Sequence, residues 1–220
     1  MHKTTLLACD PVTHDVKRFR FKRPAEFDYQ VGDATELALD MEGWRDEKRP
    51  FTMTSGPDDA ALEFTIKGYP AHDGVTTRLH DLKVGDTVLI DAPFKTFRDE
   101  GRGVFIAGGA GITPFLAILR DLDRKGRLAG YHLIFANSCA HDIICRDELE
   151  AMSGLTVTHV LSQERQPGMR HGHVNAELIR SVVDDLDQRF YLCGPPPMMD
   201  AVQTALSDLG VEADAVDLSD

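Results

Sequence analysis

The sequence lacks a long apolar segment, an excess of basic charge and a closely spaced cysteine pair. No apolar run approaches the ~20 residues that a membrane-spanning helix needs. The amino-terminal MHKTTLLACD turns acidic too soon for a signal peptide, so we expect a cytoplasmic protein with no membrane span. The formal net charge is -12, which argues against a nucleic-acid partner because no overall basic field is available to neutralise phosphates.

The cysteines are spaced too widely for the common cysteine-ligated sites. They are Cys9, Cys139, Cys145 and Cys193. No Cys-x-x-Cys pair is present, which excludes a zinc ribbon and a plant-type iron–sulfur cluster, and any iron–sulfur partner is expected to be a separate chain. His171 and His173 have no third ligand at a suitable spacing, so we predict a solvated loop there and no metal site.

The periodicity of the sequence changes near residue 100. Before it, short alternating segments separated by turn signals predict a small antiparallel β-barrel. They contain Phe19 and Phe21, Leu37 and Leu39, Phe64 and Ile66, and Val88 and Ile90. Beyond it, apolar strand segments alternate with helical patterns, which predicts a parallel α/β sheet. These lie at 104–107, 131–136, 155–161 and 190–193. We therefore expect domains at 1–99 and 103–220.

Two turns in the second half follow predicted strands. AGGAGITPF occupies 107–115, and CGPPPM occupies 193–198. A glycine-rich turn at a helix start is an anion site, because the first N–H groups lack helical partners and the helix dipole is positive there. Both turns should lie at the carboxyl edge of the sheet, where ligands bind. We expect them to hold a nucleotide, although Pro114 stands where the dinucleotide fingerprint has its third glycine.

Four motifs in register resemble the ferredoxin reductase family. They are RPFTMTS at 49–55, GVTT at 74–77, GGAGITPF at 108–115 and CGPPPM at 193–198, and their order and spacing agree over nearly the whole chain. The resemblance implies a flavin-binding antiparallel β-barrel followed by a nicotinamide-binding α/β domain. It also implies an FAD-dependent NAD(P)H reductase that passes electrons to a separate protein such as a ferredoxin, a flavodoxin or an oxygenase component.

The barrel residues suit a flavin. Arg49 offers a fork of donors for a phosphate, and Phe51 offers a flat apolar face where the family usually has tyrosine. The resemblance implies that Thr52 hydrogen-bonds the flavin N5. The apolar pattern after GVTT makes Thr76 or Thr77 the expected N-cap of a short helix, and the resemblance places the flavin pyrophosphate there, which favours FAD over FMN. The residues expected to bind FAD are Arg49, Pro50, Phe51, Thr52, Thr65, Ile66, Lys67, Gly74, Val75, Thr76 and Thr77.

The resemblance assigns the nicotinamide cofactor to the two turns of the second half. The residues implied are Gly109, Ala110, Gly111, Thr113, Cys193, Gly194 and Pro195. The pyrophosphate would lie at the glycines, Thr113 near the carboxamide and Cys193 beside the reactive carbon. Hydride transfer needs the reacting atoms ~3–3.5 Å apart and no acid–base residue, so Thr52 and Cys193 are expected to act by position.

The choice between NADH and NADPH depends on the segment after the third strand of this domain. Family members that use NADPH often have an arginine directly after a serine there, whereas Gln163 follows Ser162 in this chain. The sequence therefore favours NADH. NADPH stays open, because Arg146 and Arg165 are close in sequence and one arginine can reverse such a preference.

Two features of the sequence, and the function itself, leave alternatives open. Many family members end in an aromatic residue that covers the flavin, but this chain ends Val216-Asp217-Leu218-Ser219-Asp220, and Trp44 is another candidate cover. The basic stretch 17–23 is either a solvated strand face or a docking patch for an acidic electron carrier. A flavin reductase that releases reduced flavin, and a redox sensor or subunit without turnover, are the alternative functions.

Overall fold

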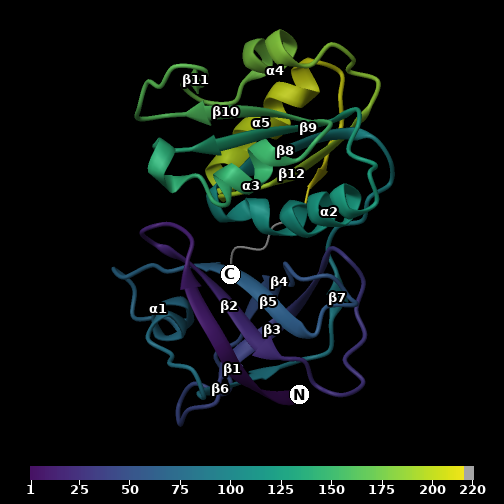
Figure 1. The fold of residues 1–220 in the computed structure, drawn as a ribbon. Helices are drawn as coiled ribbons and strands as arrows, with labels where there is room; N and C mark the ends of the chain where they lie inside the picture. The colour runs from purple at the N-terminus through teal and green to yellow at the C-terminus, as the bar shows by residue number, and fades with distance from the viewer. Residues whose placement is uncertain (216–220) are drawn as a thin grey trace.

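The computed structural model describes residues 1–215, and its amino-terminal half is an antiparallel sheet rolled into a nearly closed barrel (Figure 1). The strands are β1 (His2–Pro11), β2 (Val16–Lys22), β3 (Asp33–Leu39), β4 (Arg49–Thr52), β5 (Ala61–Lys67), β6 (Thr87–Ile90) and β7 (Phe94–Lys95). Their order is β4-β3-β6-β1-β2-β5, with β7 paired to β3. The helix α1 (Val75–His80) packs on the barrel core through Val75 and Leu79. The predicted barrel is confirmed.

Alternation along the strands builds the barrel core. Phe19, Phe21 and Phe64 are fully buried because every second side chain of a strand points to the same face. The sequence patterns do not predict β1. Its register shifts between Leu6 and Ala8 at a bulge, and a bulge interrupts the period-2 pattern by which a strand is recognised.

The second half is a parallel sheet between two layers of helices. Its strands are β8 (Gly103–Gly108), β9 (Tyr131–Asn137), β10 (Leu155–Leu161), β11 (Arg170–His171), β12 (Arg189–Cys193) and β13 (Asp214–Ala215). Its helices are η1 (Gly109–Ile112), α2 (Thr113–Arg124), η2 (Ala140–Asp142), α3 (Arg146–Ala151), α4 (Ala176–Val182) and α5 (Pro196–Asp208). Apolar side chains of α2 and α3 pack on one face, and those of α4 and α5 on the other. The predicted α/β sheet is confirmed.

The order of the parallel strands places the two glycine turns side by side. The order is β11-β10-β9-β8-β12-β13, so the chain builds outward from β8 to β11 and then returns to the opposite side of β8. The direction therefore reverses between β8 and β12. In open α/β sheets the ligand crevice lies at such a reversal, outside the carboxyl ends of the strands, and both turns begin at those ends.

The linker between the domains is held at the tyrosines of the second sheet. The Tyr131 hydroxyl donates to Asp99 Oδ1 (2.6 Å), and the Glu100 N–H donates to the Tyr191 hydroxyl (3.2 Å). The boundaries at residues 99 and 103 stay a prediction. Within residues 1–215, no helix combines the length and the apolar content needed to cross a membrane, and the cytoplasmic location likewise stays a prediction.

A charged cluster joins the two domains. Arg120 on α2 donates to the Thr54 carbonyl (2.9 Å) and to Glu63 Oε1 (2.8 Å) of the barrel, and it also pairs with Glu148 on α3. Arg18 of β2 lies 3.7 Å from Glu63 and 3.5 Å from Glu148. Burial alone would lower the pKa of Arg120, but the hydrogen bond and charge of Glu148 and the charge of Glu63 raise it. Arg120 therefore stays charged at the interface.

Replacing this arginine should weaken the whole chain. Arg120→Met leaves only Arg18 beside Glu63 and Glu148. Arg120 and Glu63 are partly buried, and breaking a fully buried ion pair costs about 3–5 kcal/mol, so we expect a loss of up to about 3 kcal/mol. Arg124→Met, one turn along the same helix, is the matched control, because Arg124 and Asp59 are both about half exposed and such a pair contributes less than about 1 kcal/mol. Urea unfolding midpoints measure both. Equal losses in the two variants would contradict the structural role of the cluster.

Candidate functional site

A cavity of about 580 Å³ lies where the two glycine turns meet the barrel, and its volume is typical of a small-molecule site. The predicted site residues that line it are Arg49, Pro50, Phe51, Thr52, Thr65, Ile66, Lys67, Gly74, Val75, Thr76, Ala110, Gly111, Thr113, Cys193, Gly194 and Pro195. Among the described residues, Thr77 and Gly109 are the predicted ones that do not line it. The fold therefore brings segments from both domains to one cavity.

The sequence patterns do not predict every lining residue. Tyr69 and His72 line the cavity from the loop between β5 and α1, and Gly108 and Pro196 line it from the turns. The only sequence signal for Tyr69 and His72 is their position directly before GVTT. Gly108 and Pro196 fall within the two recognised motifs, so motif membership is the signal for them.

Two basic side chains line the barrel wall of the cavity, and they differ in whether their charge is already paired. Arg49 donates to the Lys48 carbonyl (2.6 Å) and, within residues 1–215, forms no ion pair with a carboxylate. Lys67 instead pairs with Asp15, with a distance of 2.9 Å between Nζ and Oδ2. Arg49 is thus the cavity cation whose charge remains available to an anionic ligand, because the charge of Lys67 is already compensated.

Thr52 presents a buried hydroxyl to the cavity. Its side chain is 3% exposed, and in the described part of the chain its Oγ1 has no hydrogen-bond partner. A buried polar atom without a partner costs free energy, and such an atom in a native protein often marks a ligand. Phe51 lies beside it and packs, partly buried, against the barrel core. A flat apolar face next to an unpaired hydroxyl fits a ring that carries its own hydrogen-bonding atoms, as an isoalloxazine does.

The start of α1 differs from the prediction. Gly74 is the N-cap, in extended conformation with φ -124°, and the helix begins at Val75, so the expectation that Thr76 or Thr77 caps it is wrong. The Thr77 hydroxyl lies 2.8 Å from the Tyr69 carbonyl oxygen and 2.7 Å from that of His72. Thr77 therefore holds the loop that lines the cavity. It does not cap the helix because it is the third helical residue.

Trp44 is the other residue expected to cover the flavin. Within residues 1–215, it is not among those that line the cavity. The Arg78 guanidinium lies 5.0 Å from the centre of its ring, and Trp44 packs against the barrel core. The chain end 216–220, on which the other expectation about covering the flavin rests, lies outside the described residues.

The two glycine turns touch through their backbones. A Cβ atom built at Gly111 would lie 2.4 Å from the carbonyl oxygen of Cys193, and one at Gly194 would lie 3.2 Å from the Cα of Gly108. Only glycine permits the Gly111 approach. Cys193 is 3% exposed and lines the cavity at this contact. The floor of the cavity is therefore backbone, which lets a flat ligand approach closely.

Asn137 is a second buried polar side chain without a partner. It closes β9 at the carboxyl edge, is 8% exposed, and has no hydrogen-bond partner for its side-chain nitrogen or oxygen among the described residues. Its carbonyl accepts from the Ser162 N–H (3.0 Å), and the Ser138 carbonyl accepts from the Gln163 N–H (2.9 Å). Ser162 and Gln163, on which the choice between NADH and NADPH is expected to depend, thus lie beside Asn137. An asparagine that ends an apolar strand is the sequence signal for it.

Comparisons with known proteins assign each half of the chain to a domain family. The oxidoreductase FAD-binding domain matches residues 3–98, and the oxidoreductase NAD-binding domain matches residues 105–204. NADH-cytochrome b5 reductase 1 of Aspergillus terreus is 33% identical, over 90% of this chain and 74% of that protein.

Two further comparisons cover nearly the whole chain. The ferredoxin–NAD(P)(+) reductase component of the naphthalene 1,2-dioxygenase/salicylate 5-hydroxylase systems of Ralstonia sp is 29% identical over 95% of this chain. The chain spans 65% of the length of that protein. A ferredoxin NADP+ reductase from Neisseria gonorrhoeae, solved with bound FAD and NADP, superposes with a TM-score of 0.86 at 22% identity. It covers 99% of this chain and 98% of that chain, and it shows the same fold.

The contact between the turns can be tested by adding one methyl group. Gly111→Ala forces the Cys193 carbonyl away, and overpacking of this kind costs about 1–3 kcal/mol. We expect a fall in the unfolding temperature of about 2–4 °C per kcal/mol. Gly74→Ala is the control, because nothing lies within 4 Å of its added Cβ and the cost should stay below about 1 kcal/mol. If both variants melt together with the wild type, the backbone contact does not constrain the site.

Proposed function

The chain belongs to the ferredoxin reductase-like family of FAD- and NAD-binding oxidoreductases, and on this basis we propose that it is a flavoenzyme that oxidises NADH and passes the electrons to a separate acceptor protein. The observation that carries the proposal is the cavity shared by both domains. Its barrel wall offers an uncompensated Arg49 and the unpartnered hydroxyl of Thr52, and its other wall is the backbone contact of the two turns.

The barrel side of the cavity suits FAD. When bound, FAD accepts a hydride from a nicotinamide and releases the electrons singly. Arg49 binds a phosphate, Phe51 stacks on the ring, and the Thr52 hydroxyl supplies a hydrogen bond to the ring edge. The backbone at the start of α1 and the end of β5 holds the remaining phosphate. Lys67 contributes less than Arg49, because its ammonium is already paired with Asp15.

The other side suits the nicotinamide nucleotide. Backbone N–H groups at Ala110 and Gly111 would bind its pyrophosphate, Thr113 would orient the carboxamide, and Cys193 would set the position of the reactive carbon. Positioning is the whole task of these residues, because hydride transfer requires alignment and no proton transfer by a side chain. The shape and rigidity of the turn contact then determine the rate.

The acceptor is proposed to be a separate electron-carrier protein, of the kind served by oxygenase or cytochrome reductases. Similar proteins are named as reductases of a ferredoxin and of cytochrome b5. The basic stretch 17–23 gives little support for a docking patch, because several of its side chains are used within the chain. Arg18 joins the interdomain cluster, Arg20 pairs with Asp10, and Lys17 donates to the His80 carbonyl.

FAD retention tests the function directly. We expect the protein to purify yellow, to release FAD on denaturation, and to be bleached by anaerobic NADH. Arg49→Ala removes a charge-assisted contact of about 1.5–3 kcal/mol, so FAD affinity should fall roughly ten- to a hundredfold. Arg45→Ala is the control, since the Arg45 side chain is about half exposed and does not line the cavity as the described residues form it. FMN or no flavin in the extract would reject the FAD assignment, loosely held flavin would indicate a flavin reductase, and bound FAD that NADH does not bleach would indicate a sensor.

Cofactor preference tests the segment beside Asn137. We expect a higher kcat/KM for NADH than for NADPH, because the exposed Gln163 stands where an arginine would bind the 2′-phosphate and Arg146 is paired with Glu150 at 2.8 Å. Gln163→Arg should raise kcat/KM for NADPH roughly tenfold or more. Gln188→Arg adds the same charge before β12 and should change neither value. A wild type that prefers NADPH would overturn this proposal.

A further inference from the structure

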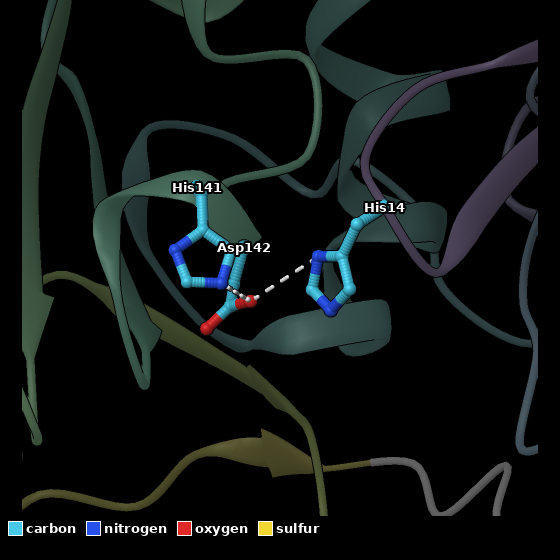
Figure 2. A group of neighbouring side chains, drawn as sticks. All are labelled: His14, His141 and Asp142. Carbon is cyan, nitrogen blue, oxygen red and sulfur yellow. Dashed lines mark ion pairs between the residues drawn. The ribbon is translucent and has the colours of Figure 1, made fainter.

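Three side chains that can ligate a metal meet at the boundary between the domains. His14 lies in the turn that joins β1 to β2 in the barrel, whereas His141 and Asp142 lie in η2 after β9. Figure 2 shows ion-pair lines from the Asp142 carboxylate to both imidazole rings. Spacing along the sequence cannot reveal this group, because the fold alone brings His14 to the second domain.

The distances are close to those that one small cation imposes. Asp142 Oδ1 lies 3.3 Å from His141 Nε2 and 3.7 Å from His14 Nδ1, and one ligand atom from each residue lies within 4.8 Å of the others. In a tetrahedral zinc site with ligands 2.0–2.2 Å from the metal, neighbouring ligand atoms are about 3.3–3.6 Å apart. Small rotations of the two exposed rings are enough to complete the geometry.

A hydrogen bond already orients one of the three ligands, and a carboxylate lies close to a second. Asp142 Oδ2 accepts from the Cys139 N–H (2.8 Å), which leaves Oδ1 toward the histidines. His14 Nε2 lies 3.7 Å from Asp15 Oδ2, and Asp15 is held by Lys67. A carboxylate behind a ligating histidine, and a hydrogen bond behind a ligating carboxylate, are the usual outer partners of a metal site.

The ligand set selects the class of ion. Two imidazoles and one carboxylate suit zinc-like ions, whereas Mg²⁺ and Ca²⁺ prefer oxygen ligands. The Asp142 carboxylate adds negative charge that favours a divalent cation, whereas the charge of Asp15 is compensated by Lys67. The His14 and His141 side chains are 57% and 66% exposed, so water can take the fourth position, as it does in three-ligand zinc sites.

We propose that His14, His141 and Asp142 form a zinc site that ties the hairpin of the barrel to the second domain. The site does not depend on the proposed reductase activity. Because His14 comes from one domain and the other two ligands from the other, the bound ion cross-links the domains. Asp15, beside His14, also pairs with Lys67 on the cavity wall.

Zinc binding to the purified chain tests the proposal. The chain is first stripped of metal with a chelator, dialysed and then titrated with Zn²⁺, and we expect it to bind one Zn²⁺ per chain. At a free zinc concentration a hundredfold above the dissociation constant, the unfolding temperature should rise by about 5–10 °C. His14→Gln and His141→Gln should each lower zinc affinity at least about tenfold. His173→Gln, which changes an exposed histidine elsewhere, should leave it unchanged, and Mg²⁺ at the same concentration should give no shift.

The exposed positions of His14 and His141 keep the test interpretable. Without zinc, both variants should unfold at the wild-type temperature, which shows that they fold. Equal zinc affinity in the wild type and in both variants would mean adventitious binding and would overturn the site. Loss of binding only in His141→Gln would overturn the bridge between the domains, because the ligands would then come from one domain.

Discussion

The close backbone contact between Gly111 and Cys193 is the constraint on which the site depends. It forms because the strand order places β8 next to β12 at the reversal of the sheet. It is possible only because glycine has no Cβ atom, which at position 111 would lie 2.4 Å from the Cys193 carbonyl oxygen. One contact therefore determines the cavity floor, the depth at which Cys193 sits, and the point where the chain turns from η1 into α2.

Helix α2 carries that constraint to the barrel. Thr113, at its first position, lines the cavity, and Arg120, two turns later, bonds the Thr54 carbonyl two residues beyond Thr52. An α-helix is a stiff rod with a rise of 1.5 Å per residue. The turn proposed to hold the nicotinamide is thus held at a set separation from the strand proposed to hold the flavin, with Glu63 and Glu148 keeping the arginine in place.

Local patterns predict the parts of this protein that local chemistry determines. Alternation such as Phe19 and Phe21 predicts barrel strands, and glycines after apolar runs predict the two turns, because both patterns reflect short-range geometry. Contacts between residues far apart in the sequence cannot be predicted from such patterns. The bulge after Leu6 hides β1, and Tyr69 and His72 reach the cavity through a loop held by Thr77. Arg18 is partly buried at a domain contact that no sequence window contains. His14 meets His141 only after both domains have folded.

The hydrogen bonds that Tyr131 and Tyr191 form with linker residues Asp99 and Glu100 limit how the two domains can move. Burial, and then the hydrogen bond to Asp99, raises the pKa of Tyr131, so its hydroxyl keeps its proton to a higher pH than that of an exposed tyrosine. Because Asp99 and Glu100 are hydrogen-bonded to the second sheet, the linker leaves the domains little freedom to rotate about it. Rotation of one domain about the linker would have to break both hydrogen bonds, so the width of the cavity depends on the linker as well as on α2.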